Sequence, residues 1–171
     1  TFSEPPTEPQ LPSYEAGDLG ESSADRVLDA LRRKQPNEAI ELASRLVAQL
    51  PFDPDSHMAM AEALLLGRRF AEALAHARRG VSLDPFNTAA WTILGIVLVK
   101  TQEYDEAKQI LDLALDKAPG ACRTHWVRAF ANLTLGHLEQ GFDDYEYGYI
   151  VGGRRMRSTM GRRWRGEPVK S

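Results

Sequence analysis

The chain has 171 residues, with 21 Lys and Arg against 24 Asp and Glu and 43% hydrophobic residues, a composition typical of one or two globular domains. Its longest apolar run, residues 93–99, is interrupted by Gly95 and ends at Lys100, well short of the roughly 18 residues that a membrane-spanning helix needs. With one cysteine, Cys122, and four scattered histidines, an intrachain disulfide and the common zinc-site spacings are excluded. We therefore expect no membrane span, no metal, no cofactor and a cytoplasmic location.

The net charge of −3 conceals opposite charges at the two ends of the chain. Residues 1–25 hold six acidic residues and neither Lys nor Arg, whereas residues 154–171 hold seven basic residues and one acidic residue. Residues 1–20 also contain four prolines, which favours an extended chain that buries little apolar surface. We predict an acidic, Pro-rich arm over residues 1–20, a folded domain over 21–153 and a basic segment or linker over 154–171.

The residues between these ends repeat with a fixed period. Two sets of small or helix-ending residues recur every 34 positions: Pro51, Pro85 and Pro119, and Ala39, Ala73 and Ala107. Each period contains two helical patterns, and the second pattern stops just before the proline, which cannot continue a helix. The predicted first helices run near 22–34, 55–67, 88–101 and 122–135, and the second helices near 37–50, 70–83, 104–117 and 138–149.

Local signals predict how these helices begin and end. Thr88 and either Asp55 or Ser56 precede apolar helical patterns, as helix N-caps do. Gly67 follows the last residue of a predicted helix, where a left-handed residue often ends the helix. We expect Gly67 to take that conformation.

One repeat carries a family resemblance. Residues 88–121 resemble a tetratricopeptide repeat (TPR) through Trp91, Leu94-Gly95, Tyr104, Ala107, Ala114 and Pro119. Residues 54–87 match less fully, residues 20–53 are weaker, and residues 122–153 form a divergent fourth unit. The resemblance implies an all-α fold, a right-handed TPR superhelix of about four helix-turn-helix repeats. Ala107 and Ala114 lie on one helix face, where small side chains permit close helix packing.

In a solenoid of this family, the first helices line the concave groove that binds partners. Helical phase places 13 residues there: Met58, Ala59, Glu62, Leu65, Thr92, Ile93, Ile96, Val99, Lys100, Arg123, Trp126, Val127 and Phe130. This set is mainly apolar, so it resembles neither the Lys- and Asn-rich carboxylate clamps nor the asparagine ladder of O-GlcNAc transferases. An alternative, left open here, is that Ile96, Val99 and Phe130 are buried between neighbouring first helices.

The apolar groove predicts a protein or peptide partner. An apolar or Pro-rich extended segment, an amphipathic helix or a second copy of the chain each suits it. The N-terminal arm of the same or a neighbouring molecule is a further candidate. The sequence has no Gly-rich phosphate loop, no HExxH and no Ser/His/Asp order, and His57 and His125 are expected to fill packing positions. We predict no catalytic residues and no enzyme activity in this chain alone.

The C-terminal end carries a second resemblance and an alternative function. Gly141-Phe142, Tyr145-Glu146 and residues 164–168 resemble the junction at which TPRs precede a glycosyltransferase-like domain in bacterial proteins. This implies a protein-interaction scaffold that serves as the docking arm of such a protein. The alternative is polyanion or nucleic-acid binding through the Arg-rich segment with Trp164. It is the weaker prediction because the basic residues follow one another on a terminal segment and do not line a folded face.

Overall fold

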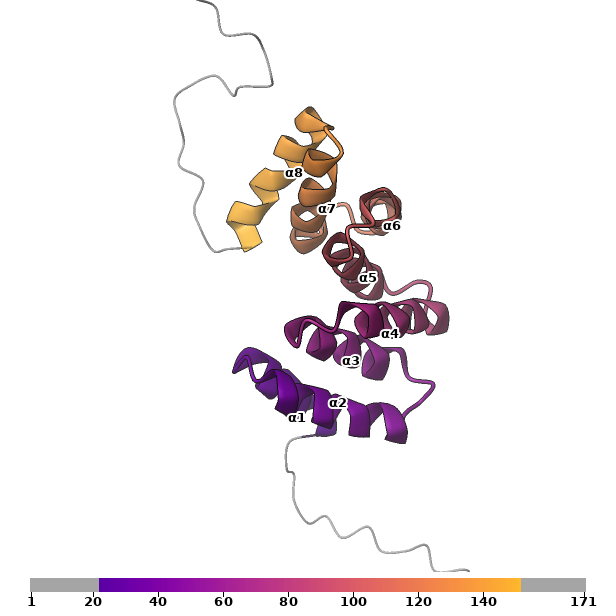
Figure 1. Ribbon diagram of the computed structural model, residues 1–171. Coiled ribbons are helices and arrows are strands. Elements are labelled where there is room, and N and C mark those ends of the chain that lie inside the picture. Colours follow the sequence, from indigo (N-terminus) through magenta and orange to yellow (C-terminus); the bar gives the residue numbers. More distant parts are fainter. Residues whose placement is uncertain (1–21, 152–171) are drawn as a thin grey trace, which may run out of the picture.

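The computed structural model describes residues 22–151, with side chains up to residue 147. Within this range the chain forms eight α-helices and no strand (Figure 1): α1 (Ser23–Arg32), α2 (Pro36–Gln49), α3 (Pro54–Leu66), α4 (Phe70–Leu83), α5 (Thr88–Lys100), α6 (Tyr104–Lys117), α7 (Cys122–Thr134) and α8 (Leu138–Val151). The all-α solenoid of helix pairs is confirmed, and helix ends lie within about two residues of their predicted positions. The predicted arm and basic segment lie outside the described residues, so the division into domains stays a prediction.

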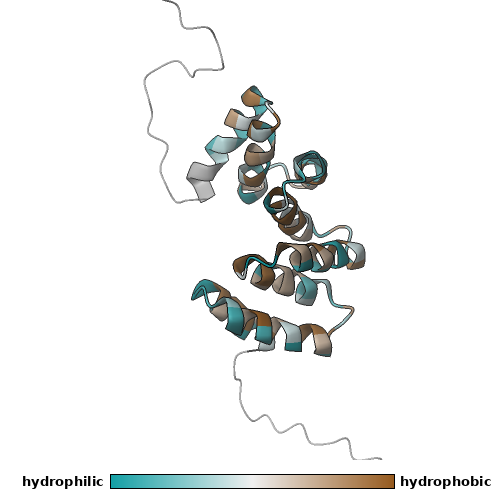
Figure 2. Cartoon of the chain, in the orientation of Figure 1, coloured by the Kyte–Doolittle hydropathy of each residue, from teal (hydrophilic) through white to brown (hydrophobic). Residues whose placement is uncertain are grey.

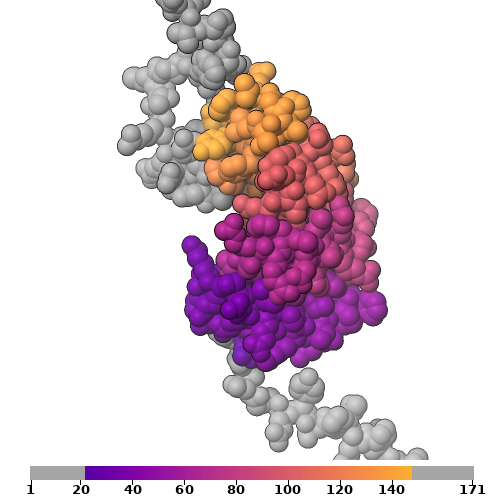
Figure 3. Space-filling view, viewed as in Figure 1, coloured from indigo at the N-terminus to yellow at the C-terminus, as the bar shows by residue number. Residues whose placement is uncertain are grey.

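The helix pairs stack in chain order, with the first and last described residues at opposite ends of the stack (Figure 1). The first helices form one continuous row, because α3 contacts α1 and α5, and α5 contacts α7. Each of α2, α4 and α6 contacts its own first helix and the first helix of the next pair. Figure 3 shows the repeats pressed against one another along the chain. Each of the first three repeats is thus covered by its successor.

Among the described helices, the central helix α5 has the most buried residues. It contacts α3, α4, α6 and α7, and it is strongly hydrophobic along its length (Figure 2). Val97 and Leu98 are fully buried in the main core cluster. A helix that is apolar all round is stable only when neighbours cover all its faces, which explains why this pattern occurs in the middle of the stack.

Small residues set the separation within each pair. Ala39, Ala73 and Ala107 are fully buried, as the 34-residue period predicts. A Cβ atom on Gly95 of α5 would overlap with the side chain of Leu111 in α6, so one of the two groups would have to shift. The glycine therefore permits α5 and α6 to pack closely.

Two of the predicted helix caps are wrong. Asn87 caps α5, because its Oδ1 accepts hydrogen bonds from the backbone N–H groups of the alanines at positions 89 and 90. Asp53 caps α3 by accepting from the backbone N–H of Ser56 at 2.7 Å. Asn and Asp at these positions reach orphan N–H groups from just outside the helix, so each cap lies before the residue that the apolar pattern suggested.

The predicted left-handed conformation of Gly67 is also wrong, since its φ is −76°. The left-handed residue is the next one, Arg68, with φ 60°. Left-handed residues recur with the repeat period in the four turns within the helix pairs: Lys34, Arg68, Gln102 and Gly136. The geometry of the pair imposes this conformation at the same position each time, and only the fourth repeat places a glycine there.

Candidate functional site

A pocket of about 350 Å³ opens along the row of first helices. Its lining comes from every first helix: Leu31 of α1, Glu62, Leu65 and Leu66 of α3, Ile96 and Lys100 of α5, and Arg123 of α7. Four of these seven side chains are aliphatic and three are charged. The pocket therefore combines apolar surface with charged groups, and all four repeats contribute to it.

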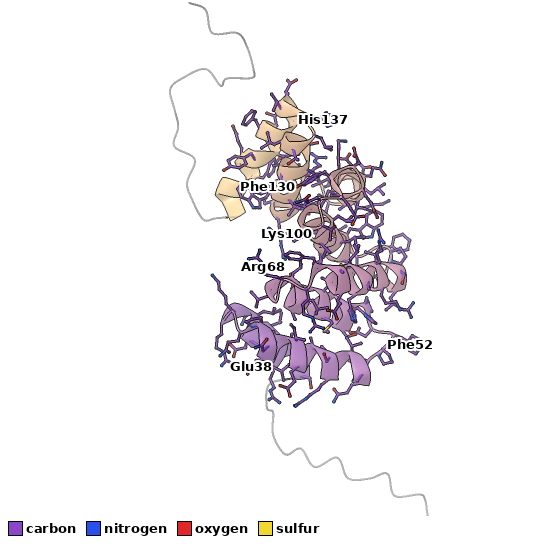
Figure 4. The ribbon with its side chains drawn as sticks, viewed as in Figure 1. Glu38, Phe52, Arg68, Lys100, Phe130 and His137 are labelled. Carbon is purple, nitrogen blue, oxygen red and sulfur yellow. The ribbon has the colours of Figure 1, made fainter. Side chains whose placement is uncertain are left out.

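An ion pair links two repeats across this pocket. Nη2 of Arg123 donates to Oε1 of Glu62 at 2.9 Å, joining α7 to α3. Both side chains stay partly exposed, so the pair contributes little stability, and its effect is to orient the two groups. Lys100 is exposed (Figure 4). With Glu62 matched by Arg123, Lys100 leaves the pocket with an excess of positive charge.

The structure places five of the 13 predicted groove residues around this pocket: Glu62, Leu65, Ile96, Lys100 and Arg123. Leu31 also lines it and was missed, because the first repeat keeps few TPR positions. The signal was present nonetheless, since Leu31 lies one 34-residue period before Leu65.

Three predicted groove residues are corrected by their burial. Thr92, Ile93 and Val127 are buried, and the two aliphatic residues belong to the main core cluster. The hydroxyl of Thr92 contacts that of Thr124 at 2.8 Å between α5 and α7. Helical phase predicts on which side of its helix a residue lies. It does not predict that the neighbouring first helix covers that side, as happens for these three side chains.

The remaining predicted residues lie at intermediate positions. Met58, Ala59 and Val99 are half-buried and pack against the core clusters. The half-burial of Val99 agrees with the alternative in which such residues pack between first helices, as does that of Ile96 at the pocket. Of Met58, Ala59 and Val99, none lines the pocket.

Trp126 and Phe130 form a separate aromatic cluster with Tyr145. Their ring centroids lie 5.0 Å apart with the planes nearly perpendicular, and Trp126 lies 4.8 Å from Tyr145 of α8. In Figure 4 Phe130 and Lys100 lie on the same side of the stack, whereas Phe52 projects on the opposite side. Phe130 is exposed, so the alternative of burial does not hold for it.

A network of charged side chains joins α6, α7 and α8. The buried Asp144 accepts hydrogen bonds from Nδ1 of His125 at 2.7 Å and from Nε of Arg128 at 2.7 Å. Nη1 of Arg128 also donates to Asp112 at 2.6 Å. Burial alone would lower the pKa of Arg128, but its hydrogen bonds to the two aspartates raise it. Each charge has a partner, so the network acts as a structural tie between helices.

Two histidines form a smaller polar contact in the second repeat. Nδ1 of His57 lies 3.0 Å from Nδ1 of His76, and Nε2 of His57 lies 3.1 Å from the carbonyl oxygen of Pro51. That carbonyl can only accept, so the Nε2 of His57 donates and its Nδ1 accepts from His76. Burial, followed by the nearby His57, lowers the pKa of His76. The folded state therefore favours the neutral form of His76.

Within the described part of the chain, no three His, Cys, Asp or Glu side chains are grouped so that they could hold a metal ion. None of its helices is both long enough and apolar enough to cross a membrane. The absence of enzyme activity stays a prediction.

Comparisons with known proteins agree with the interpretation of the chain as a series of repeats. A sequence model of the ANAPC3 family, described as anaphase-promoting complex, cyclosome, subunit 3, matches residues 32–114. The structure of TTC0263, a thermophilic TPR protein in Thermus thermophilus, is similar with a TM-score of 0.67 and 20% identity, covering 75% of this chain and 71% of that one.

Two further solved structures are similar over most of their length. MamA from residue 41 to the end, from Desulfovibrio magneticus RS-1, has a TM-score of 0.63 and 22% identity, covering 80% of this chain and 78% of that one. The first TPR of Spaghetti (RPAP3), bound to the HSP90 peptide SRMEEVD, has a TM-score of 0.62 and 19% identity, covering 67% of this chain and 90% of that one. At these identities the likeness is one of fold.

Proposed function

We propose that this chain, which has the fold of a tetratricopeptide-repeat solenoid, works as a protein-interaction module that binds an extended peptide segment in the pocket along its first helices. The observation that carries the proposal is that all four first helices line one pocket with aliphatic side chains and a cationic excess. The similar Spaghetti (RPAP3) domain was solved with a bound peptide, so the fold is compatible with this use. A cytoplasmic location remains part of the proposal.

The pocket lining defines the kind of segment that fits. Leu31, Leu65, Leu66 and Ile96 favour one or two apolar side chains, and each Å² of apolar surface they remove from water contributes about 25 cal/mol. Lys100, the source of the positive excess at this pocket, favours an acidic residue beside the apolar ones. The bound segment is therefore apolar and acidic, with a backbone extended enough to cross several repeats.

The N-terminal arm of the same or a neighbouring molecule matches this description. Residues 1–18 combine apolar residues such as Phe2, Leu11 and Tyr14 with four acidic residues and four prolines. A chain stiffened by proline loses less conformational entropy when it docks. A second copy of the folded domain is the competing occupant of the pocket.

The binding function is tested with peptides displayed on phage and selected on the full chain. Enriched peptides should combine apolar and acidic residues, and Ile96→Ser should weaken their binding by about tenfold or more, as expected when an apolar contact of about 1.4 kcal/mol is lost. Leu113→Ser is the matched control, because Leu113 is exposed on α6, away from the pocket. Equal binding by both variants would overturn the proposed pocket.

The arm is tested by deleting residues 1–18 and measuring the binding of a dye that reports exposed apolar surface, together with the sedimentation of the chain. If the arm occupies the pocket, dye binding rises after the deletion, and adding Ile96→Ser reverses most of the rise. Unchanged dye binding with a dimer that persists identifies the second copy as the occupant. A monomer with unchanged dye binding excludes both.

The finer proposal is that the solenoid is the docking arm of a larger bacterial glycosyltransferase-like protein. It is supported by three short motifs that resemble such a junction: Gly141-Phe142, Tyr145-Glu146 and residues 164–168. The third motif lies outside the described residues. The sequence of the full gene tests it. A nucleotide-sugar-binding domain is expected after Ser171, and a gene without one would refute the glycosyltransferase link while leaving the peptide-binding proposal intact.

A further inference from the structure

Two phenylalanines are the most exposed large apolar side chains in the described part of the chain. Phe52 is 77% exposed and Phe86 is 85% exposed, and they lie one 34-residue period apart, in the turns before α3 and α5. Leu50, beside the first of them, is also exposed. A single exposed apolar residue needs no explanation, whereas a group of them marks a contact surface. We call the surface of these two turns, residues 50–53 and 84–87, the turn ridge.

The same backbone turn carries both rings. In the first turn the N–H of Asp53 donates to the carbonyl oxygen of Leu50 at 3.2 Å. In the second turn the N–H of Asn87 donates to the carbonyl oxygen of Asp84 at 3.3 Å. Each turn has proline at its second position and phenylalanine at its third. Because proline fixes its own φ, the turns are restricted before binding, and a partner that contacts the rings orders little additional chain.

The spacing of the two turns follows from the stacking of the repeats. The helices that they precede, α3 and α5, contact each other, and packed helices lie about 8–10 Å apart. Seven residues of an α-helix extend about 10.5 Å, so apolar side chains at positions i and i+7 of a partner helix can reach both rings. A helix also satisfies its own backbone hydrogen bonds, which suits turns whose N–H and C=O groups already pair with each other.

The turn ridge is acidic and lies away from the pocket. Asp53 and Asp84 belong to the two turns, and Asp55 is exposed in the first turn of α3. Residues 46–67 and 80–99 contain neither Lys nor Arg. In Figure 4 Phe52 projects on the side of the stack opposite Lys100, which lines the pocket. The two surfaces therefore differ in position and in the sign of their charge.

Two arginines lie one helical turn before the ends of α2 and α4. Arg45 pairs with Glu41, and Arg79 is exposed. One further positive charge against three carboxylates leaves the turn ridge negative. A partner of this surface therefore needs Lys or Arg beside its apolar side chains.

We propose that the turn ridge is a second docking surface, which binds a basic amphipathic helix of a partner protein through apolar side chains seven residues apart. Its acidic residues repel the apolar, acidic segment that suits the pocket, so the two surfaces select different partners. The proposal does not depend on peptide binding in the pocket, because the two surfaces share no residue.

The third turn offers a variant that enlarges the ridge. The N–H of Ala121 donates to the carbonyl oxygen of Ala118 at 3.0 Å, as in the other two turns, but Gly120 occupies the position of the phenylalanine. A Cβ atom on Gly120 would meet no atom within 4 Å, and the φ of Gly120 is not left-handed. Gly120→Phe should therefore add a third exposed ring without disturbing the core.

The test measures the binding of labelled synthetic peptides to the full chain by fluorescence anisotropy. The probe is a peptide with leucine at helical positions i, i+3, i+4 and i+7 and lysine elsewhere. Phe52→Ser combined with Phe86→Ser should weaken its binding about tenfold or more, as expected when aromatic anchors are lost. Gly120→Phe should strengthen its binding several-fold. Added salt should weaken binding to the wild type, because it screens the charges on this exposed surface.

Three controls accompany these variants. Leu113→Ser removes an exposed apolar side chain on α6, outside the ridge, and Ile96→Ser alters the pocket. Both should leave the binding of the lysine peptide unchanged. A peptide with glutamate in place of lysine should bind equally to the wild type and to the double phenylalanine variant. Thermal midpoints should stay close to that of the wild type, because the substituted rings are exposed.

Four outcomes would each overturn the proposal. The first is equal binding of the lysine peptide to the wild type and the double phenylalanine variant. The second is loss of that binding in Ile96→Ser, which would place the peptide in the pocket. A dimer in sedimentation that the double phenylalanine variant abolishes would assign the ridge to a second copy. Binding to phosphatidylcholine vesicles that requires both rings would assign it to a membrane surface.

Discussion

The second, third and fourth repeats fill the same position of the helix pair with different chemistry. The first-helix residue at this position is His57, Trp91 or His125, and its second-helix counterpart, 19 residues later, is His76, Ile110 or Asp144. The second and fourth repeats form polar contacts here, at 3.0 Å between the two histidines and at 2.7 Å between His125 and Asp144. One backbone arrangement thus accepts an apolar pair or a polar pair.

The polar and apolar pairs differ in their hydrogen bonding to the turn before the first helix. Nε2 of His57 lies 3.1 Å from the carbonyl oxygen of Pro51, and Nε2 of His125 lies 2.8 Å from that of Pro119. Nε1 of Trp91 is buried and has no hydrogen-bond partner among the described residues. The histidines therefore connect the helix pair to the preceding turn, whereas Trp91 contributes mainly apolar volume.

The fourth repeat extends its polar pair into the network around Asp144. This carboxylate also accepts from Arg128 and Asn132, and Arg128 reaches Asp112 on α6. Interior repeats are held by apolar packing on both sides, whereas the last repeat has a neighbour on one side only among the described helices. The comparison indicates that charged hydrogen bonds replace part of the missing apolar contact.

The largest effect is expected from breaking this network with Asp144→Ala. The change leaves Arg128 and His125 partly buried without their shared acceptor, and such a loss costs about 3–5 kcal/mol. Urea denaturation followed by circular dichroism measures it. Asp116→Ala, at an exposed acid on α6, should change stability by no more than about 0.5 kcal/mol. A similar small change for both variants would contradict the structural role of the network.

A smaller loss is expected from overpacking the apolar third repeat. Ala107 is fully buried, so Ala107→Leu forces α5 and α6 apart and costs about 1–3 kcal/mol. Ala75→Leu is the control, because Ala75 is exposed on the second helix α4 and the two residue types have similar helix propensity. The difference between their thermal midpoints gives the packing cost, and equal midpoints would show that the repeat register is wrong.

The sequence alone predicts the helices and the small core residues because both recur with the 34-residue period. It predicts the groove only in part, since helical phase gives the side on which Ile93 and Val127 lie but not their coverage by the next first helix. The network around Asp144 was not predicted. Its members are separated by up to 32 residues, from Asp112 to Asp144, and His125 was interpreted as a packing substitute for tryptophan.

The smallest effect, and the most direct test of the comparison, comes from placing the third-repeat pair in the second repeat with His57→Trp and His76→Ile. Burial and the adjacent His57 lower the pKa of His76 below its ordinary value of 6.5, so the folded state binds fewer protons than the unfolded state between these two pKa values. Stability then rises with pH in this window and falls as the pH decreases from about 6.5 through the lowered pKa.

The double variant should lose less stability than the wild type between about pH 7.5 and about pH 5 in urea denaturation, because Trp and Ile bind no protons. His137→Gln, which removes an exposed histidine, should keep the wild-type pH dependence. Identical pH dependence in the wild type and the double variant would show that the two kinds of pair do not differ in their response to acid.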